Sequence, residues 1–148
     1  MKSRPAPSLK GRALRYLSRR EHSRLELHRK LLPHAESEDQ LERLLDGLER
    51  AGWLSDERFA ESVVHRKAGR FGSELIRHEL RGHAIDEALF EDQLATLRET
   101  ELDRARALWQ RRFGTAADSP QARARQYRFL RARGFAADVV HKVIGSES

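Results

Sequence analysis

Three near-copies of one helix end punctuate this chain. In each copy a leucine is followed four positions later by a small residue and then by a large apolar one. The copies are Leu48-Gly52-Trp53, Leu80-Ala84-Ile85 and Leu130-Gly134-Phe135. The pattern is typical of a helix that ends on a left-handed residue, with the next side chain folded back onto the helix. Alanine adopts positive φ only at a steric cost, so an earlier end at Gly82 is the alternative for the second copy.

Apolar residues between these helix ends recur with the spacing of a helical face. One stripe consists of Leu41, Leu44, Leu45 and Leu48, and a second lies over 139–144. No stretch alternates apolar and polar residues for long enough to indicate a strand. The sequence therefore predicts an all-α protein.

A signal for a new helix follows each of the three helix ends, near Ser55, Asp86 and Ala136. Tandem helical units of this kind stack so that each unit buries a face of its neighbour. We therefore expect an elongated array of three units with three helices apiece. The predicted boundaries near Leu54 and Leu97 give a flexible basic tail over 1–10 and units over 11–54, 55–97 and 98–148.

Serines mark two of the expected helix starts. Ser23 with Glu26 and Ser37 with Gln40 have capping-box spacing, in which the hydroxyl accepts from the first turn and the later side chain reaches back. The residues before Ser23 are therefore predicted to contain a helix end and a tight corner rather than one continuous helix.

The balance of charged and apolar residues favours an extended shape. Charged residues make up 35% of the 148 residues and hydrophobic residues 39%, against about 25% and about 45–50% in average globular domains. The chain has no cysteine, which excludes a disulfide framework and suits a reducing compartment. With no apolar run of about 20 residues and no secretory signal, we expect a cytoplasmic protein that does not contact a membrane.

Residue patterns that support catalysis are missing from the sequence. The seven histidines form no HExxH pair, and neither a glycine-rich phosphate loop nor a GxSxG motif occurs. Metal sites need convergent ligands that these spacings do not offer. We therefore expect a binding protein without catalytic residues, cofactor or metal, rather than an enzyme.

Positive charge, +6 in net, is concentrated in three segments. In the first, arginines alternate with Glu21 and Glu26, which favours a solvated face with local ion pairs as strongly as it favours a partner. In the second and third no acid intervenes, and DNA phosphate or an acidic protein groove is the favoured partner over solvent and counterions alone. The candidate partner-binding residues, chosen on charge alone, are Arg19, Arg20, Arg24, Arg66, Lys67, Arg70, Arg123, Arg125, Arg128, Arg131 and Arg133.

Aromatic residues interleave with the third basic segment, an arrangement found in proteins that stack bases. Tyr127 fits a core face, so Phe129 is the one residue of that segment left for exposure. We assign Trp53 and Trp109 to packing as well. Because the planar fork of arginine suits both phosphate and carboxylate, residue type does not separate a DNA partner from a protein partner.

Three segments of the sequence resemble the signature segments of the RecX regulatory proteins. They read YLSRREHSRLELHRKL, GWLSDERFAES and ARQYRFLRARGF, and their order and separation match the family from about Leu14 to Ile144. A fourth segment, RFGSELIRHELRGHAI, departs from the pattern. Family members often carry Gly-Pro and Gly-Ile where this chain has Gly72-Ser73 and Ala84-Ile85.

The resemblance implies a modulator of the RecA recombinase, built as a curved array of three three-helix units without an active site or cofactor. Such proteins lie in the groove of the RecA–DNA filament and limit filament growth, ATP hydrolysis and strand exchange. The RecA filament is therefore the expected partner, with single- or double-stranded DNA phosphate as a further one. We expect a monomer, because no heptad seam is present. The alternatives are a sequence-tolerant DNA-binding module and a helical scaffold for another acidic protein.

Overall fold

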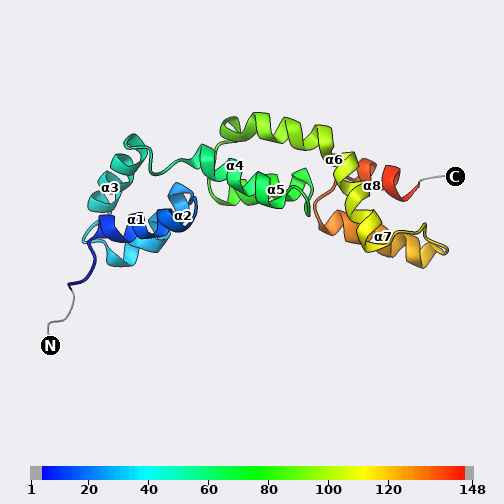
Figure 1. Cartoon of the computed structure of the whole chain (residues 1–148), viewed down its shortest axis with the longest axis horizontal. Helices are drawn as coiled ribbons and strands as arrows, with labels where there is room; N and C mark the ends of the chain where they lie inside the picture. Colours follow the sequence, from blue (N-terminus) through cyan, green and yellow to red (C-terminus); the bar gives the residue numbers. More distant parts are fainter. Residues whose placement is uncertain (1–4, 146–148) are drawn as a thin grey trace.

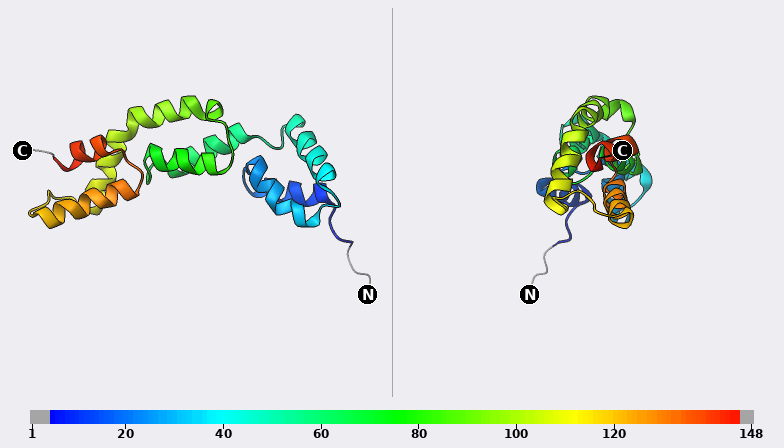
Figure 2. Two further views of the ribbon diagram at one scale, coloured as in Figure 1. Left: turned by 180° about the vertical axis from the view of Figure 1, so that it is seen from behind. Right: turned by 90° about the vertical axis from the view of Figure 1, so that its right-hand side faces the viewer.

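The computed structural model describes residues 5–145, which form α-helices and short 3-10 helices and no strand. The elements in chain order are α1 (Leu9–Arg19), α2 (Arg24–Leu31), η1 (Leu32–His34), α3 (Glu38–Arg50), α4 (Asp56–Lys67), α5 (Ser73–Gly82), η2 (Glu87–Phe90), α6 (Glu91–Arg112), α7 (Pro120–Ala132) and α8 (Ala137–Ile144). They follow one another along a curved, elongated molecule with the termini at opposite ends (Figures 1 and 2). The expected all-α array of three units is confirmed.

Each unit has its own small hydrophobic core. The first is built by α1, α2 and α3 around Leu27, Leu31 and Leu45. The second is built by α4, α5, η2 and the start of α6, and the third by the end of α6 with α7 and α8. Because the 22-residue helix α6 enters two cores, it joins the second and third units without a break.

The three repeated helix ends close in the same way. The amide of the residue after the small one donates to the leucine carbonyl, and the small residue has positive φ. The three bonds are Trp53 N to Leu48 O at 2.9 Å, Ile85 N to Leu80 O at 3.3 Å and Phe135 N to Leu130 O at 3.3 Å. The corresponding φ values are +84° at Gly52, +56° at Ala84 and +92° at Gly134. Although α5 ends at Gly82, its left-handed residue is therefore Ala84, at a cost of about 1 kcal/mol.

The large residue of each repeat does not always enter the core. Ile85 and Phe135 are buried as expected, whereas Trp53 is 53% exposed. The packing assignment of Trp53 is wrong, because Leu54, one residue later, occupies the first core and also donates to the carbonyl of Leu48. Trp109 does pack against the third core.

The predicted serine caps are present, but their reciprocal halves differ. Ser23 Oγ accepts from Glu26 N, and Ser37 Oγ accepts from Gln40 N, each at 3.1 Å. Gln40 reaches back to the amide of Glu36 instead of the serine. The carboxylate of Glu26 accepts hydrogen bonds from Arg20 instead. The local helix starts therefore follow the sequence signal, while the later side chains follow their wider surroundings.

The unit boundaries at Leu54 and Leu97 stay predictions. Leu54 lies in the connection between α3 and α4, and Leu97 lies inside α6. The expected tail over 1–10 falls partly outside the described residues. Within the described part, Ser8 caps α1 by accepting from Gly11 N at 2.9 Å.

Candidate functional site

The arginines of the first basic segment form ion pairs largely with carboxylates of the same chain. Arg24 on α2 lies 2.6–2.9 Å from three acids of α3, namely Glu42, Asp46 and Glu49. Burial works against the charge of Arg24, but the hydrogen bonds that its guanidinium group donates to these carboxylates raise its pKa. This is the face with local ion pairs that was one of two interpretations of the alternating basic and acidic residues.

Arg20, at the corner between α1 and α2, is paired as well. Both of its terminal nitrogens donate to Glu26. Partial burial would raise the pKa of Glu26, but the Arg20 hydrogen bond and the positive charges of His22, Arg20 and Lys30 lower it to about 2. Arg19, at the end of α1, is exposed. In this segment Arg20 and Arg24 thus offer a partner little unpaired charge, whereas Arg19 and Arg29 are exposed.

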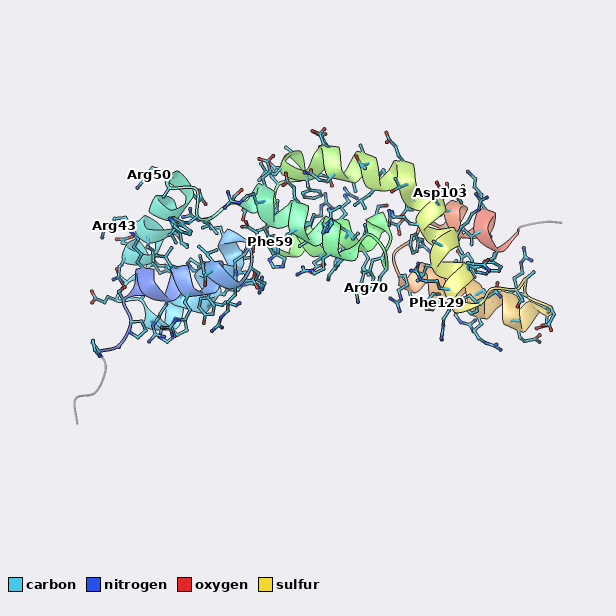
Figure 3. The ribbon with its side chains drawn as sticks, in the orientation of Figure 1. Arg43, Arg50, Phe59, Arg70, Asp103 and Phe129 are labelled. Carbon is cyan, nitrogen blue, oxygen red and sulfur yellow. The ribbon has the colours of Figure 1, made fainter. Side chains whose placement is uncertain are left out.

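The second and third basic segments meet in space, although more than fifty positions separate them in sequence. Arg70, in the turn between α4 and α5, and Arg133, at the end of α7, both lie over the ring of Phe71, at 5.5 and 5.3 Å from its centroid. Arg133 also lies 5.1 Å from the centroid of Phe129. Figure 3 shows Arg70 and Phe129 at the same edge of the molecule.

The end of α6 supplies a further arginine at this place. Arg112 lies 5.3 Å from the ring centroid of Phe129 and 5.9 Å from that of Phe113, and the two rings pack edge to face. We name this group the junction patch; its members are Arg70, Phe71, Arg112, Phe113, Phe129 and Arg133. Three separate chain segments therefore build one surface of alternating guanidinium groups and aromatic rings.

The remaining predicted residues are spread over several environments. Lys67 pairs with Glu79 at 2.6 Å, and Arg131 pairs with Glu74 at 3.2 Å. Arg66 and Arg125 are exposed. Arg123 and Arg128 line a groove of about 430 Å³ between α7 and α8. The structure does not gather the arginines of α7 on one face, since Arg131 and Arg133 turn toward the second unit.

Close backbone contact holds the two halves of the junction patch in place. Gly72 N, at the start of α5, donates to Arg133 O at 2.7 Å, and Glu74 N donates to Gly134 O at 3.2 Å. A Cβ atom at Gly72 would overlap the Gly134 carbonyl, so only glycine allows this approach. Amides at the start of α5 that have no partner within their helix are thus paired with carbonyls that follow α7.

A buried polar pair completes the joint between the second and third units. Glu101 on α6 accepts from Ser73 N at 2.7 Å and from Ser73 Oγ at 2.9 Å. A proline at position 73, as the resemblance led one to expect, has no amide for this bond. Nearby, Arg104 donates to the carbonyls of Ala68 and Phe71 at 2.7 and 2.8 Å.

The sequence reasoning missed Arg104, Arg111 and Arg112. Arg111 donates to the carbonyl of Gly69 at 3.1 Å and so belongs to the same joint. The segment WQRRF carried a signal for the last two, because two arginines stand between aromatic residues at a helix end. Arg104 had no such signal, since its partners are carbonyls about 35 positions away.

Metal-binding clusters and membrane-spanning helices are both absent from the described residues. Over 5–145 no group of three or more histidine, cysteine or acidic side chains is arranged to hold a metal ion. No helix in that range has the length and apolar character needed to cross a membrane.

The fold defines the class of protein first: an all-α protein built as a tandem array of three-helix units. Models of the RecX family match all three units, described as the first, second and third three-helix domains of RecX, over residues 10–48, 55–94 and 99–144. The chain belongs to the family of RecX regulatory proteins.

Similar proteins agree with this assignment. "Regulatory protein RecX" of Ralstonia pickettii (strain 12J) is 53% identical over 137 residues, which cover 93% of this chain and 86% of the relative. The protein of the same name from Leptothrix cholodnii is 52% identical over 142 residues, covering 96% and 90%. A crystal structure of regulatory protein RecX superposes with a TM-score of 0.77 at 26% identity, covering 94% of this chain and 72% of that one. The relatives carry the name of a regulatory protein and not of an enzyme.

Proposed function

We propose that this protein is a negative regulator of the RecA recombinase. It binds in the groove of the RecA–DNA filament and limits filament growth, ATP hydrolysis and strand exchange during DNA repair and recombination. In this proposal it acts in the cytoplasm as a monomer, by binding alone, and uses no catalytic residue or cofactor.

The observation that carries the proposal is the shape of the chain together with its family. A curved array of three units is long and narrow (Figure 2), and membership of the RecX family suggests a recombinase target. An elongated binder contacts several protomers of a helical filament at once. Such contacts either couple neighbouring protomers or block the next addition.

Charge supplies the attachment in this proposal. The second and third basic segments contribute more than the first, because carboxylates of the same chain pair with Arg20 and Arg24. The groove of a protein–DNA filament offers both acidic side chains and phosphate as counter-charges. Salt therefore weakens the binding.

The test is DNA-stimulated ATP hydrolysis by the cognate RecA while this protein is titrated well below one copy per protomer. A fall in hydrolysis at that ratio supports a regulator that caps an end or spans several protomers. Unchanged hydrolysis at equal stoichiometry contradicts the proposal.

A variant of α7 separates attachment from folding. Replacing Arg123, Arg125 and Arg128 with alanine is expected to weaken filament binding, because these arginines have no carboxylate partner within the described residues. The helical circular-dichroism signal should persist. Unchanged filament binding at moderate salt contradicts attachment through α7.

A further inference from the structure

We propose that the junction patch is a binding site for single-stranded DNA. Successive phosphates are bound by the guanidinium groups of Arg70, Arg112 and Arg133. Unstacked bases pack on the surface of aromatic rings and guanidinium groups. The inference rests on the patch alone and holds whether or not a recombinase is the target.

The three arginines of the patch are pre-organised. Each guanidinium group lies 5.1–5.9 Å from at least one phenylalanine ring centroid, within the range of a cation–π contact. Arg133 bridges Phe71 and Phe129, and Arg112 bridges Phe113 and Phe129. Stacking on rings restrains these long side chains, so less conformational entropy is lost when their N–H edges bind phosphate.

The same three arginines have no internal counter-charge within the described part of the chain. Among residues 5–145, no carboxylate lies within ion-pair distance of Arg70, Arg112 or Arg133. In the first unit, by contrast, Arg24 has three such partners. Three neighbouring guanidinium groups without acids repel one another, and an anionic strand relieves that repulsion.

The phenylalanine rings of the patch favour a single strand over a duplex. Phe71 and Phe129 pack against the second and third cores, and Phe113 packs edge to face on Phe129, while all three residues stay partly exposed. Bases of a single strand are free to stack on such rings or on the guanidinium planes above them. In a duplex the bases are already stacked and present only their edges and the phosphates.

Rigid support completes the site. The patch straddles the joint where the amide of Gly72 bonds to the carbonyl of Arg133, and where Arg111 bonds to the carbonyl of Gly69. These bonds fix the spacing between Arg70 and Arg133. The ligand therefore meets a preformed surface instead of ordering one on binding.

The experiment measures fluorescence anisotropy of a labelled oligothymidylate of about 20 nucleotides with the full chain and without recombinase. The patch variant carries Arg70→Gln, Arg112→Gln and Arg133→Gln. The control variant carries Arg29→Gln, Arg43→Gln and Arg50→Gln in the first unit, which removes the same charge; Arg43 and Arg50 lie at the opposite end of the molecule in Figure 3. Circular dichroism and thermal unfolding confirm that both variants fold.

The patch variant is expected to bind about tenfold more weakly, and the slope of log K against log salt is expected to shrink by about 2, which is three lost contacts at about 0.7 each. The control variant should keep most of the affinity and slope. A second variant, Phe71→Leu with Phe129→Leu, should keep the slope and lose affinity, because it removes rings and no charge.

Equal loss in the patch and control variants, or wild-type binding to a duplex as tight as to the single strand, overturns the inference. Failure of the proposed function looks different. In that case RecA hydrolysis is unaffected by the wild-type protein while oligothymidylate binding still depends on the patch.

Discussion

The first joint of the array is held mainly by side-chain contacts, whereas the second adds a continuous helix and direct backbone–backbone hydrogen bonds. Between the first and second units, Asp56 Oδ1 accepts from Arg24 N at 2.8 Å, Glu21 pairs with Arg58 at 2.9 Å, and Ser23 Oγ lies 2.7 Å from His83 Nδ1. Between the second and third units, helix α6 is continuous and backbone amides of α5 bond to backbone carbonyls after α7.

The different contacts at the two joints indicate which joint is able to bend. Side-chain contacts between partly exposed groups are weak and screened by salt. Backbone contacts that need glycine, and a buried carboxylate with two donors, tolerate almost no displacement. We infer that the second and third units move as one body and that the first unit is attached by a polar hinge. The junction patch lies on the rigid side.

The largest expected effect comes from breaking the rigid joint at Gly72. Gly72→Ala introduces a Cβ atom that overlaps the Gly134 carbonyl, so the two backbones must separate. The free energy of unfolding should fall by about 3 kcal/mol, measured by urea denaturation. Gly69→Ala is the matched control, because its Cβ atom meets no other atom within 4 Å. Equal stability of the two variants contradicts the close-contact account.

The buried carboxylate of the same joint gives the next effect. Glu101→Ala leaves the amide and hydroxyl of Ser73 buried without their acceptor. The expected loss is about 2 kcal/mol in the free energy of unfolding. Glu99→Ala on the exposed side of α6 should change it by less than about 0.5 kcal/mol. If thermal unfolding shows the two alanine variants to be alike, Glu101 contributes nothing to the joint.

Acid is expected to weaken the first unit. Burial lowers the pKa of His22 below 6.5, aided by the charges of Arg20 and Lys30 and opposed by its bond to the Arg20 carbonyl and by Glu26. The folded state then holds fewer protons than the unfolded state, so stability falls as pH drops below 6.5. Glu26 has a depressed pKa, and its contribution is lost between pH 4.5 and about 2.

The measurement compares thermal unfolding of the wild type and His22→Gln at pH 7 and at about pH 5.5. Acidification should destabilise the wild type more than the variant. An identical pH response of the two proteins contradicts this account, because it means that His22 binds protons equally in the folded and unfolded states.

Arg58→Gln is expected to change the free energy of unfolding least. Its clearest effect is expected on the distance between the first and second units. The Glu21–Arg58 pair is partly exposed, so its loss costs under about 1 kcal/mol. Since the chain has no cysteine, spin labels at cysteines replacing Arg43 and Thr96 report on the first joint alone. Labels replacing Thr96 and Gln121 report on the second.

The distance distribution across the first joint should broaden in the variant and in high salt. The distribution across the second joint should stay narrow in both conditions. Equal broadening across the two joints contradicts the assignment of hinge and rigid body.

Local features of this protein were predictable because each depends on a few neighbouring residues. The helix ends at Leu48, Leu80 and Leu130 form from backbone bonds within six residues, and the caps at Ser23 and Ser37 form within four. Helical periodicity in the same way indicated an all-α fold, and the three repeated helix ends indicated three units. The packing assignment of Trp53 was wrong because the neighbouring residue, Leu54, competes for the same core.

For the candidate site, the sequence predicted only which residues carry positive charge. The sequence determined which segments are basic, but the contacts that neutralise or expose that charge join residues far apart in the chain. Tertiary structure decided that three acids of α3 surround Arg24 and that Arg70 meets Arg133 over one ring. The physical reason is that Coulomb and stacking energies depend on distances in space, and those distances are set by how α5, α6 and α7 pack.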